Sequence, residues 1–320
     1  MYQEFYKLRE MPFELTASTK YLYLTPRHLE ALSNLQYGLS AAKAVTMLVG
    51  EAGTGKTTLL KAALASERCR QVRCVCLSNP ALTRGEFIEL LAVSFGLSAH
   101  AARSKAALLP ELEKTVIERR SRGEITALVV DEAQSLSAEL LEEVRLLANL
   151  ETESQKLLPL VLIGQPELGA RLEERSLRQL KQRVALRCEI SPFQLPETAG
   201  YIASRIRTAG GVAIRLFTRE AVMLIHQYSG GIPRTISVIC DNALIHGLAL
   251  GRQPVDQHMV LDVCRDFRLN GWNPSDTREP AALSDAPRVP LSAGVEHAAS
   301  QIEHEANDEP RFRLFGTRRR

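Results

Sequence analysis

A glycine-rich string with one lysine is the strongest chemical pattern in this chain. GEAGTGKT, from Gly50 to Thr57, matches the phosphate-binding pattern G-x-x-x-x-G-K-[ST]. The apolar run AVTMLVG (44–50) precedes it, and GTGKTTLLKAALA has helical periodicity, so a strand and a helix are expected on its two sides. Glycines let backbone N–H groups surround a β-phosphate, and the helix start adds positive potential. The string predicts a nucleoside triphosphate site; the alternative is a chance match in a Gly-rich turn.

Two side chains of this string have specific expected roles. Lys56 is expected to reach the β- and γ-phosphates, and the Thr57 hydroxyl is expected to take one position on Mg²⁺. The residues that we expect to contact the nucleotide are Gly50, Glu51, Ala52, Gly53, Thr54, Gly55, Lys56, Thr57 and Thr58.

A pair of acids follows an apolar run in LVVDE, at Asp131 and Glu132. Such a run predicts a buried strand that delivers both carboxylates to the sheet edge where ligands bind. Asp131 fits a Mg²⁺ ligand, and Glu132 fits the base that polarises the attacking water. The alternative is a pair of solvent-facing acids at a strand end. The guanine-reading motif Asn/Thr-Lys-x-Asp does not occur in the sequence, which favours ATP over GTP.

Three further positions carry polar groups that fit catalysis. Gln165 ends the apolar run LPLVLIG (158–164), where it is expected to orient water against the γ-phosphate; an ordinary strand end before Pro166 is the alternative. Arg183 lies in the basic string LRQLKQRV and is the first candidate for an arginine finger acting on a neighbouring subunit. Arg178 is the second candidate, and a solvated cationic helix face is the alternative.

A fifth pattern, GGIPRT (230–235), predicts a helix start, because Pro is favoured in the first turn. Such a start would aim Arg234, which we expect to touch the γ-phosphate in its own subunit. The alternative is a plain helix start with a solvated arginine.

Apolar periodicity predicts the elements that must position these residues. Strands are expected over 44–50, 72–78, 125–132, 158–164 and 185–190, and helices over 26–42, 83–95, 111–121, 137–150 and 166–182. Strands that alternate with helices imply a parallel sheet covered on both faces. The pattern is helical from 196 to 267. We therefore expect an α/β nucleotide-binding domain with an N-terminal strap (1–193), a small all-helical lid domain (194–268) and a disordered tail rich in Pro, Ser and Asp (269–320).

Composition excludes several classes of protein. With 45% hydrophobic and 24% charged residues in 320, the chain is neither a disordered protein nor a small disulfide scaffold. Its net charge of +3 is too small to indicate by itself that the protein binds nucleic acid. No apolar stretch reaches the roughly 20 residues of a membrane helix, and the N-terminus shows no secretory signal. We expect a cytoplasmic protein whose six cysteines are reduced and mostly serve as small buried hydrophobes.

Taken in this order, the patterns resemble the AAA+ ATPases, and more closely the general secretion pathway protein A (ExeA-like) family. The specific strings are MYQEFYKLREMPF, LVLIGQPEL and SGGIPRTI, and the resemblance covers about residues 1–268. It implies that Gln165 is sensor 1, that Arg234 is sensor 2, and that Arg183 is the trans-acting finger. It also implies an adenine pocket lined by Tyr23, Leu24 and His28. ATP and Mg²⁺ are the implied cofactors.

Two functions remain open on the sequence. The first is an ATPase that self-associates into a ring or filament and drives assembly of a secretion or envelope-export machine, in the cytoplasm or at the periphery of the inner membrane. The second is an ATP-switched protein of the transposition-helper kind, which binds duplex DNA. Founding secretion members continue into a membrane span and a peptidoglycan-binding domain, whereas this chain ends in RFRLFGTRRR. That end either contacts acidic lipid or nucleic acid or is a solvated terminus.

Overall fold

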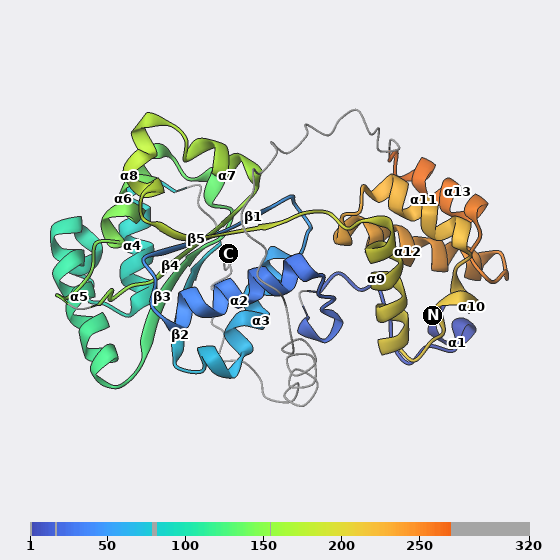
Figure 1. Cartoon of the computed structure of the whole chain (residues 1–320), viewed down its shortest axis with the longest axis horizontal. Coiled ribbons are helices and arrows are strands. Elements are labelled where there is room, and N and C mark those ends of the chain that lie inside the picture. The colour runs from blue at the N-terminus through green and yellow to red at the C-terminus, as the bar shows by residue number, and fades with distance from the viewer. Residues whose placement is uncertain (1, 17, 79–81, 154, 270–320) are drawn as a thin grey trace, which may run out of the picture.

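The computed structural model describes residues 2–16, 18–78, 82–153 and 155–269. Figure 1 shows two lobes along the long axis, one built around a sheet and the other made of helices. Apart from residue 269, the predicted tail lies outside the described residues. Within those residues, no helix is both long enough and apolar enough to cross a bilayer.

The sheet has five parallel strands in the order β2-β3-β4-β1-β5. The strands are β1 (Val45–Gly50), β2 (Val72–Leu77), β3 (Ile125–Val130), β4 (Leu160–Gly164) and β5 (Val184–Ile190). Every residue of β1, β3 and β4 is buried, as expected for parallel strands covered on both faces. Because the strands are parallel, the loops that follow β1, β3 and β4 meet at one edge, which brings the predicted site residues together. The predicted α/β fold is confirmed.

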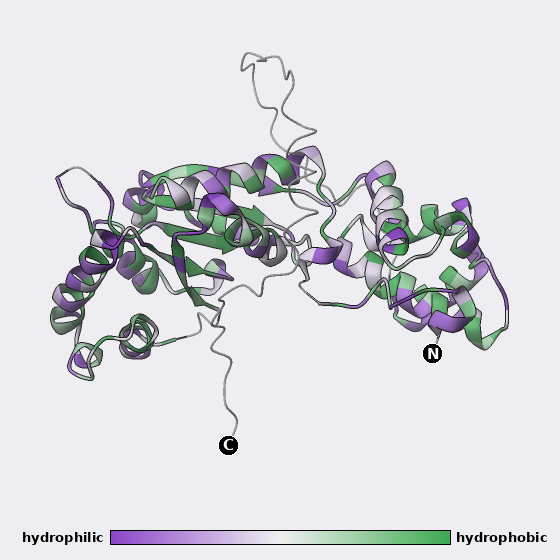
Figure 2. Ribbon diagram, turned by 90° about the horizontal axis from the view of Figure 1, so that it is seen from below, coloured by the Kyte–Doolittle hydropathy of each residue, from purple (hydrophilic) through white to green (hydrophobic). Residues whose placement is uncertain are grey.

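Helices cover the sheet from both sides. Alternation along β1 divides its side chains, so that Met47 and Val49 join one core while Leu48 joins the other. Figure 2 shows the hydrophobic strands between the two helical layers. The first core is covered by α4 (Arg84–Phe95), α5 (Lys105–Ser121), α6 (Ala138–Leu147), α7 (Pro166–Arg171) and α8 (Arg178–Lys181), and the second by α2 (Pro26–Ser40) and α3 (Lys56–Ala65).

Most predicted helices begin at a local capping signal. Thr25 precedes Pro26 and its side chain accepts a hydrogen bond from the backbone N–H of His28, which fixes the start of α2. Helix α5 begins at Lys105, six residues before the predicted start at 111. The Ser104 side chain caps it by accepting a hydrogen bond from the backbone N–H of Ala107 at 3.2 Å. The helix therefore begins before Pro110 and continues through it.

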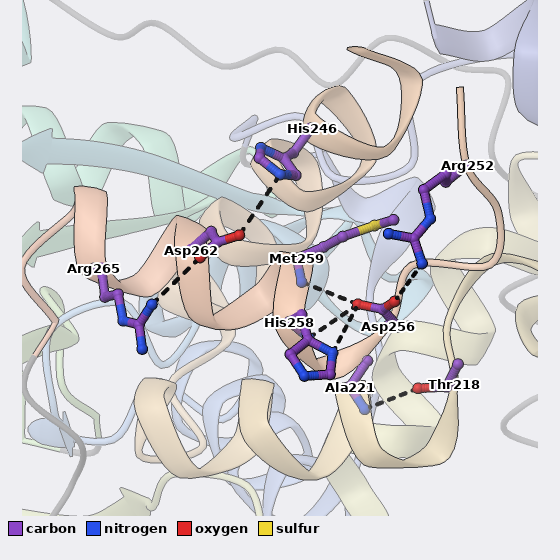
Figure 3. A network of polar contacts seen from close by, with 9 residues as sticks. All are labelled: Thr218, Ala221, His246, Arg252, Asp256, His258, Met259, Asp262 and Arg265. Carbon is purple, nitrogen blue, oxygen red and sulfur yellow. Dashed lines mark hydrogen bonds and ion pairs between the residues drawn. The ribbon is translucent and has the colours of Figure 1, made fainter. Parts of the chain in front are cut away.

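The helical lobe has its own hydrophobic core. Its helices are α9 (Leu195–Thr208), α10 (Ala213–Leu216), α11 (Arg219–Ser229), α12 (Pro233–Ala249) and α13 (Gln257–Asp266). Asp256 caps α13 by accepting from the backbone N–H groups of His258 and Met259 at 2.9 and 3.1 Å, and it also pairs with Arg252 (Figure 3). The helices predicted over 196–267 are therefore confirmed.

The N-terminal segment connects the two lobes. Helix α1 (Tyr2–Tyr6) packs in the core of the helical lobe, where it contacts α12. The Tyr2 hydroxyl donates to Asp241 at 2.5 Å, and the Arg9 backbone N–H donates to the Ala209 carbonyl at 2.8 Å. The chain then passes to α2 on the sheet. The strap thus ties the lid to the α/β lobe, and the domain limits at 193 and 268 stay predictions.

Candidate active site

A cavity of about 380 Å³ lies where the glycine-rich loop, the N-terminal strap and the helical lobe meet. Its lining combines the loop at residues 53–58, the strap, the acid Glu132 and residues of the helical lobe. The volume is in the range of pockets that hold small ligands. This is the place where the sequence motifs predicted a nucleotide.

The glycine-rich loop runs from the end of β1 to the start of α3. Gly53 and Gly55 have φ of 83° and 98°, which glycine adopts without steric cost. Position 50 requires glycine for a different reason, because a Cβ there would lie 2.6 Å from the Ile190 carbonyl oxygen. Residues 53–58 line the cavity, whereas Gly50, Glu51 and Ala52 shape the loop without lining it.

Lys56 is buried at the base of this loop. Its Nζ donates to the carbonyl oxygens of Gly50 at 2.8 Å and Glu51 at 3.0 Å. Burial lowers the pKa of Lys56, and the neighbouring Glu132 and Asp131 carboxylates act against that shift. A lysine held in this way places a cation at the floor of the loop, where a phosphate group would meet it.

Thr57 and the two acids form the polar edge of the site. The Thr57 hydroxyl donates to Asp131 Oδ2 at 3.0 Å, and the Glu132 backbone N–H donates to Asp131 Oδ1 at 3.0 Å. Hydroxyl and carboxylate oxygens are the ligands that Mg²⁺ prefers, so this pair fits the ion. Glu132 lines the cavity, and its backbone is left-handed with φ of 55°.

Gln165 is joined to the acids by a residue that the sequence reasoning missed. The Gln165 backbone N–H donates to Gln134 Oε1 at 3.1 Å, and Gln134 Nε2 donates to Glu132 Oε2 at 2.5 Å. Its place two residues after Glu132 marks Gln134 as a neighbour of the acids, but it does not indicate which way the side chain points. Gln165 does not itself line the cavity, so its predicted contact with the γ-phosphate stays a prediction.

The helical lobe contacts the loop through Arg234. Its backbone N–H donates to the Gly53 carbonyl at 3.2 Å, and Arg234 lines the cavity. Gly231 has φ of 75° and its carbonyl accepts from the Phe193 N–H at 2.8 Å. This fixes the start of α12 beside the α/β lobe. The predicted helix start therefore brings Arg234 to the phosphate-binding loop.

Aromatic side chains form the other end of the cavity. Tyr23 and His28 line this part of the cavity, while their contact with adenine stays a prediction; Phe193 lies between them with ring-centroid distances of 5.7 and 5.5 Å. Burial lowers the pKa of His28, which favours the neutral ring. Leu24 is not among the lining residues and packs instead against the α2–α3 core. Flat aromatic surfaces suit stacking with a base.

Arg205 is a second residue that the sequence reasoning missed. It is buried in the cavity wall, where it donates to the Tyr201 hydroxyl at 2.5 Å and to Ser237 Oγ at 3.0 Å. It also donates to the Glu14 carbonyl oxygen at 3.2 Å, and its guanidinium lies 4.7 Å from the Tyr21 ring centroid. Arg205 therefore ties the strap to the lid.

Arg183 and Arg178 lie away from this cavity. Arg183 precedes β5, and Val184 pairs with Val45 at the first residue of β1, so Arg183 lies at the sheet edge opposite the phosphate-binding loop. It borders a separate hollow together with Arg145, Gln179 and Gln182. Neither predicted finger lines the cavity of its own chain.

The cysteines lie outside the site and carry free thiols. Four are buried, and Cys74 and Cys76 on β2 are half-buried with their Sγ atoms 3.6 Å apart. Among the described residues there is no group of three or more side chains that could hold a metal through His, Cys, Asp or Glu. A zinc-type site is therefore not built from this part of the chain.

Comparison with known proteins agrees with this geometry. A family model described as an AAA domain matches residues 40–172. General secretion pathway protein A of Aeromonas hydrophila is 38% identical over 295 residues, which cover 92% of this chain and 52% of that protein. The chain therefore spans about half the length of this relative.

Solved structures share the fold at low sequence identity. The ORC2 protein of Aeropyrum pernix, described as ADPNP-ADP complexes, has a TM-score of 0.58 at 17% identity, covering 80% of this chain and 71% of that one. Cdc6p from Pyrobaculum aerophilum has a TM-score of 0.59 at 18% identity, with coverage of 80% and 70%. Drosophila ORC bound to DNA has a TM-score of 0.57 at 18% identity, with coverage of 81% and 66%.

The five-stranded sheet, the phosphate-binding loop and the paired acids define an AAA+ ATPase, a class of enzyme that hydrolyses ATP. Within that class, the extended similarity places the chain more narrowly. It is similar over 92% of its length to general secretion pathway protein A, the resemblance that the sequence strings predicted.

Proposed function

We propose that this chain binds ATP with Mg²⁺ in the cavity and couples its hydrolysis to the assembly or remodelling of a secretion or envelope-export machine. The observation that carries the proposal is the convergence of Lys56, Thr57, Asp131, Glu132 and Arg234 on one cavity and its edge. These groups come from the ends of two strands, β1 and β3, and from the lid. Together they provide a cation for the phosphates, ligands for Mg²⁺ and a general base, which phosphoryl transfer requires.

Each residue has a role that follows from its position. Lys56 binds the β- and γ-phosphates after its Nζ exchanges its present carbonyl partners for phosphate oxygens. Thr57 and Asp131 hold Mg²⁺, which neutralises charge on the phosphates when bound. Glu132 accepts a proton from the water that attacks the γ-phosphorus. Arg234 faces the phosphates from the lid, so closure of the lid would bring a second cation to the γ-phosphate.

Two substitutions test the core of this proposal. Lys56→Ala should abolish ATP binding in a fluorescence titration, because it removes the charge-assisted contact to the phosphates. Glu132→Gln should retain binding but lose turnover, because the amide cannot accept the proton. Lys114→Ala and Glu113→Gln, both exposed on α5, are the matched controls and should behave like the parent. Parent-like ATP affinity in Lys56→Ala would rule out the phosphate-binding role of the loop.

We further propose that hydrolysis needs a second subunit, which contributes Arg183. The arginine lies far from its own cavity and borders an open hollow, as a residue presented to a neighbour would. Arginine fingers contribute roughly 10³–10⁵ in rate, so Arg183→Ala should bind ATP normally and hydrolyse it poorly. Mixing it with Lys56→Ala subunits should restore activity, since one interface then pairs an intact cavity with an intact finger. No recovery in demonstrably mixed oligomers would exclude the trans role, and a loss confined to Arg178→Ala would move it to Arg178.

The machine that the ATPase serves is a separate part of the proposal. Similarity to general secretion pathway protein A supports a role in secretion. The second candidate is an ATP-switched protein bound to duplex DNA, favoured by exposed arginines at 175, 178 and 187 and by the shared fold with an ORC that is bound to DNA. ATPase assays with and without duplex DNA separate the two. Stimulation by DNA that is lost in an Arg175→Ala, Arg178→Ala and Arg187→Ala triple variant would favour the second.

A further inference from the structure

The side-chain amide of Gln134 contacts the predicted base on one side and the neighbouring strand end on the other. Its Nε2 donates to Glu132 Oε2 at 2.5 Å, and its Oε1 accepts from the Gln165 backbone N–H at 3.1 Å. An amide offers both a donor and an acceptor, so both groups are used in one orientation. A donor to an ionised carboxylate makes one of the stronger hydrogen bonds in proteins.

The surroundings of Gln134 hold this amide in place. Arg171, at the end of α7, donates from Nη1 to the carbonyl oxygens of Gln134 at 2.5 Å and Leu136 at 2.7 Å. At the end of β4, Gly164 leaves space for the Gln134 side-chain amide, because a Cβ at position 164 would lie 2.8 Å from Gln134 Oε1. The backbone and the side chain of Gln134 are therefore both fixed by residues of β4 and α7.

Glu132 needs such support because its own backbone is unusual. Its φ of 55° and ψ of 38° are left-handed, a conformation that costs energy for a residue with a side chain. Its N–H is held by Asp131 Oδ1 at 3.0 Å, which orients the peptide but leaves the flexible side chain free to rotate. The bond from Gln134 restricts that rotation at the far end of the side chain.

We propose that Gln134 is a positioning residue for ATP hydrolysis, which aims the Glu132 carboxylate at the attacking water and ties it to the start of α7. The proposal rests on the proposed role of Glu132 as the base. Gln134 itself is not among the residues that line the cavity, so it acts through Glu132 and leaves ATP binding to other residues. Loss of the amide would let the carboxylate occupy several rotamers, of which few are productive.

The first test separates turnover from binding. Gln134→Ala and Gln134→Met, which keeps the length without the polar atoms, should lower kcat by roughly 10- to 100-fold, the effect of one hydrogen bond to a charged group. KM and the affinity for ATP should stay within about twofold of the parent, because the phosphate contacts are intact. Gln134→Glu keeps the acceptor for Gln165 but cannot donate when ionised, so it should be as slow as Gln134→Ala. Gln71→Ala, exposed before β2, is the matched control.

The second test asks whether Gln134 acts through Glu132. In a Glu132→Gln background, measured in single turnovers, Gln134→Ala should cause no further loss, since the group that it positions is already gone. Thermal unfolding of each variant checks that the protein is folded. Parent-like kcat in both Gln134→Ala and Gln134→Met would overturn the inference, as would an equal loss in the two backgrounds. Parent-like turnover of Glu132→Gln alone would instead overturn the proposed role of Glu132.

Discussion

Gly53 is where the lid presses on the phosphate-binding loop, and replacing it with alanine tests that contact. A Cβ at Gly53 would lie 2.8 Å from Arg234 Cβ, closer than side chains tolerate, and 3.1 Å from Ile232 Cγ2, which is a tight contact. At Gly55 the same substitution meets no heavy atom within 4 Å among the described residues. The φ values are similar, 83° and 98°, so Gly55→Ala is a control matched for backbone strain.

The expected magnitudes differ between the two variants. A left-handed backbone costs an alanine about 1–2 kcal/mol, which applies to both positions. Gly53→Ala adds overpacking of about 1–3 kcal/mol against α12, and it also strains the 3.2 Å hydrogen bond from the Arg234 N–H to the Gly53 carbonyl. We therefore expect the free energy of unfolding to fall by about 1–2 kcal/mol in Gly55→Ala and by about 2–5 kcal/mol in Gly53→Ala.

The assay is urea unfolding followed by far-UV circular dichroism, on the two variants and the parent. Because the overpacking displaces Arg234 from the cavity, Gly53→Ala should also hydrolyse ATP more slowly than the parent. Equal destabilisation of the two variants, within about 0.5 kcal/mol, would refute the reasoning, since it would leave backbone strain as the whole effect. The lid would then not press on the loop at Gly53.

Three further predictions concern single contacts. Burial lowers the pKa of His28 below its ordinary value of 6.5, so the unfolded chain binds a proton first and the free energy of unfolding should decrease as the pH falls through 6.5. His28→Gln should flatten that decrease in urea titrations at pH 8.0 and 5.5. Tyr2→Phe removes the hydrogen bond to Asp241 and should lower stability by about 1–2 kcal/mol, measured by thermal unfolding, whereas an unchanged Tm would show that the bond contributes nothing. Gly164→Ala would displace the Gln134 amide and should reduce kcat with little change in KM; an unchanged kcat would show that the amide tolerates the displacement.

The sequence alone determined the parts of the site that depend on local spacing. Gly53, Gly55 and Lys56 are recognisable because a phosphate-binding loop needs those residue types in that order. Asp131 and Glu132 are recognisable because a fully apolar run predicts a buried strand that ends at them. The parallel sheet follows from the alternation of strands and helices, since parallel strands need crossover connections. In each case the physical constraint acts within a few residues of chain.

Other features depended on which segments pack together. The bond between Tyr2 and Asp241 joins residues 239 apart, and no periodicity near either one indicates the other. The strap therefore contributes to the helical core, although the sequence analysis grouped it with the α/β domain (1–193). Arg205 shares one face of α9 with the buried Tyr201 and Ile202, and its guanidinium lies over the ring of Tyr21 in the strap.

Within the site, the orientation of Gln134 was also decided by tertiary packing and not by local sequence. Its side chain could equally have faced solvent as part of a loop, because one glutamine two residues after an acid sets no direction. What decided its orientation is that the ends of β3 and β4 are neighbours in the sheet, which brings the Gln165 N–H to 3.1 Å of its oxygen. Local sequence specifies chemistry and secondary structure over a few residues. Contacts between distant segments are set by the packing that buries the most apolar surface with its polar groups satisfied, and that balance exists only in the folded chain.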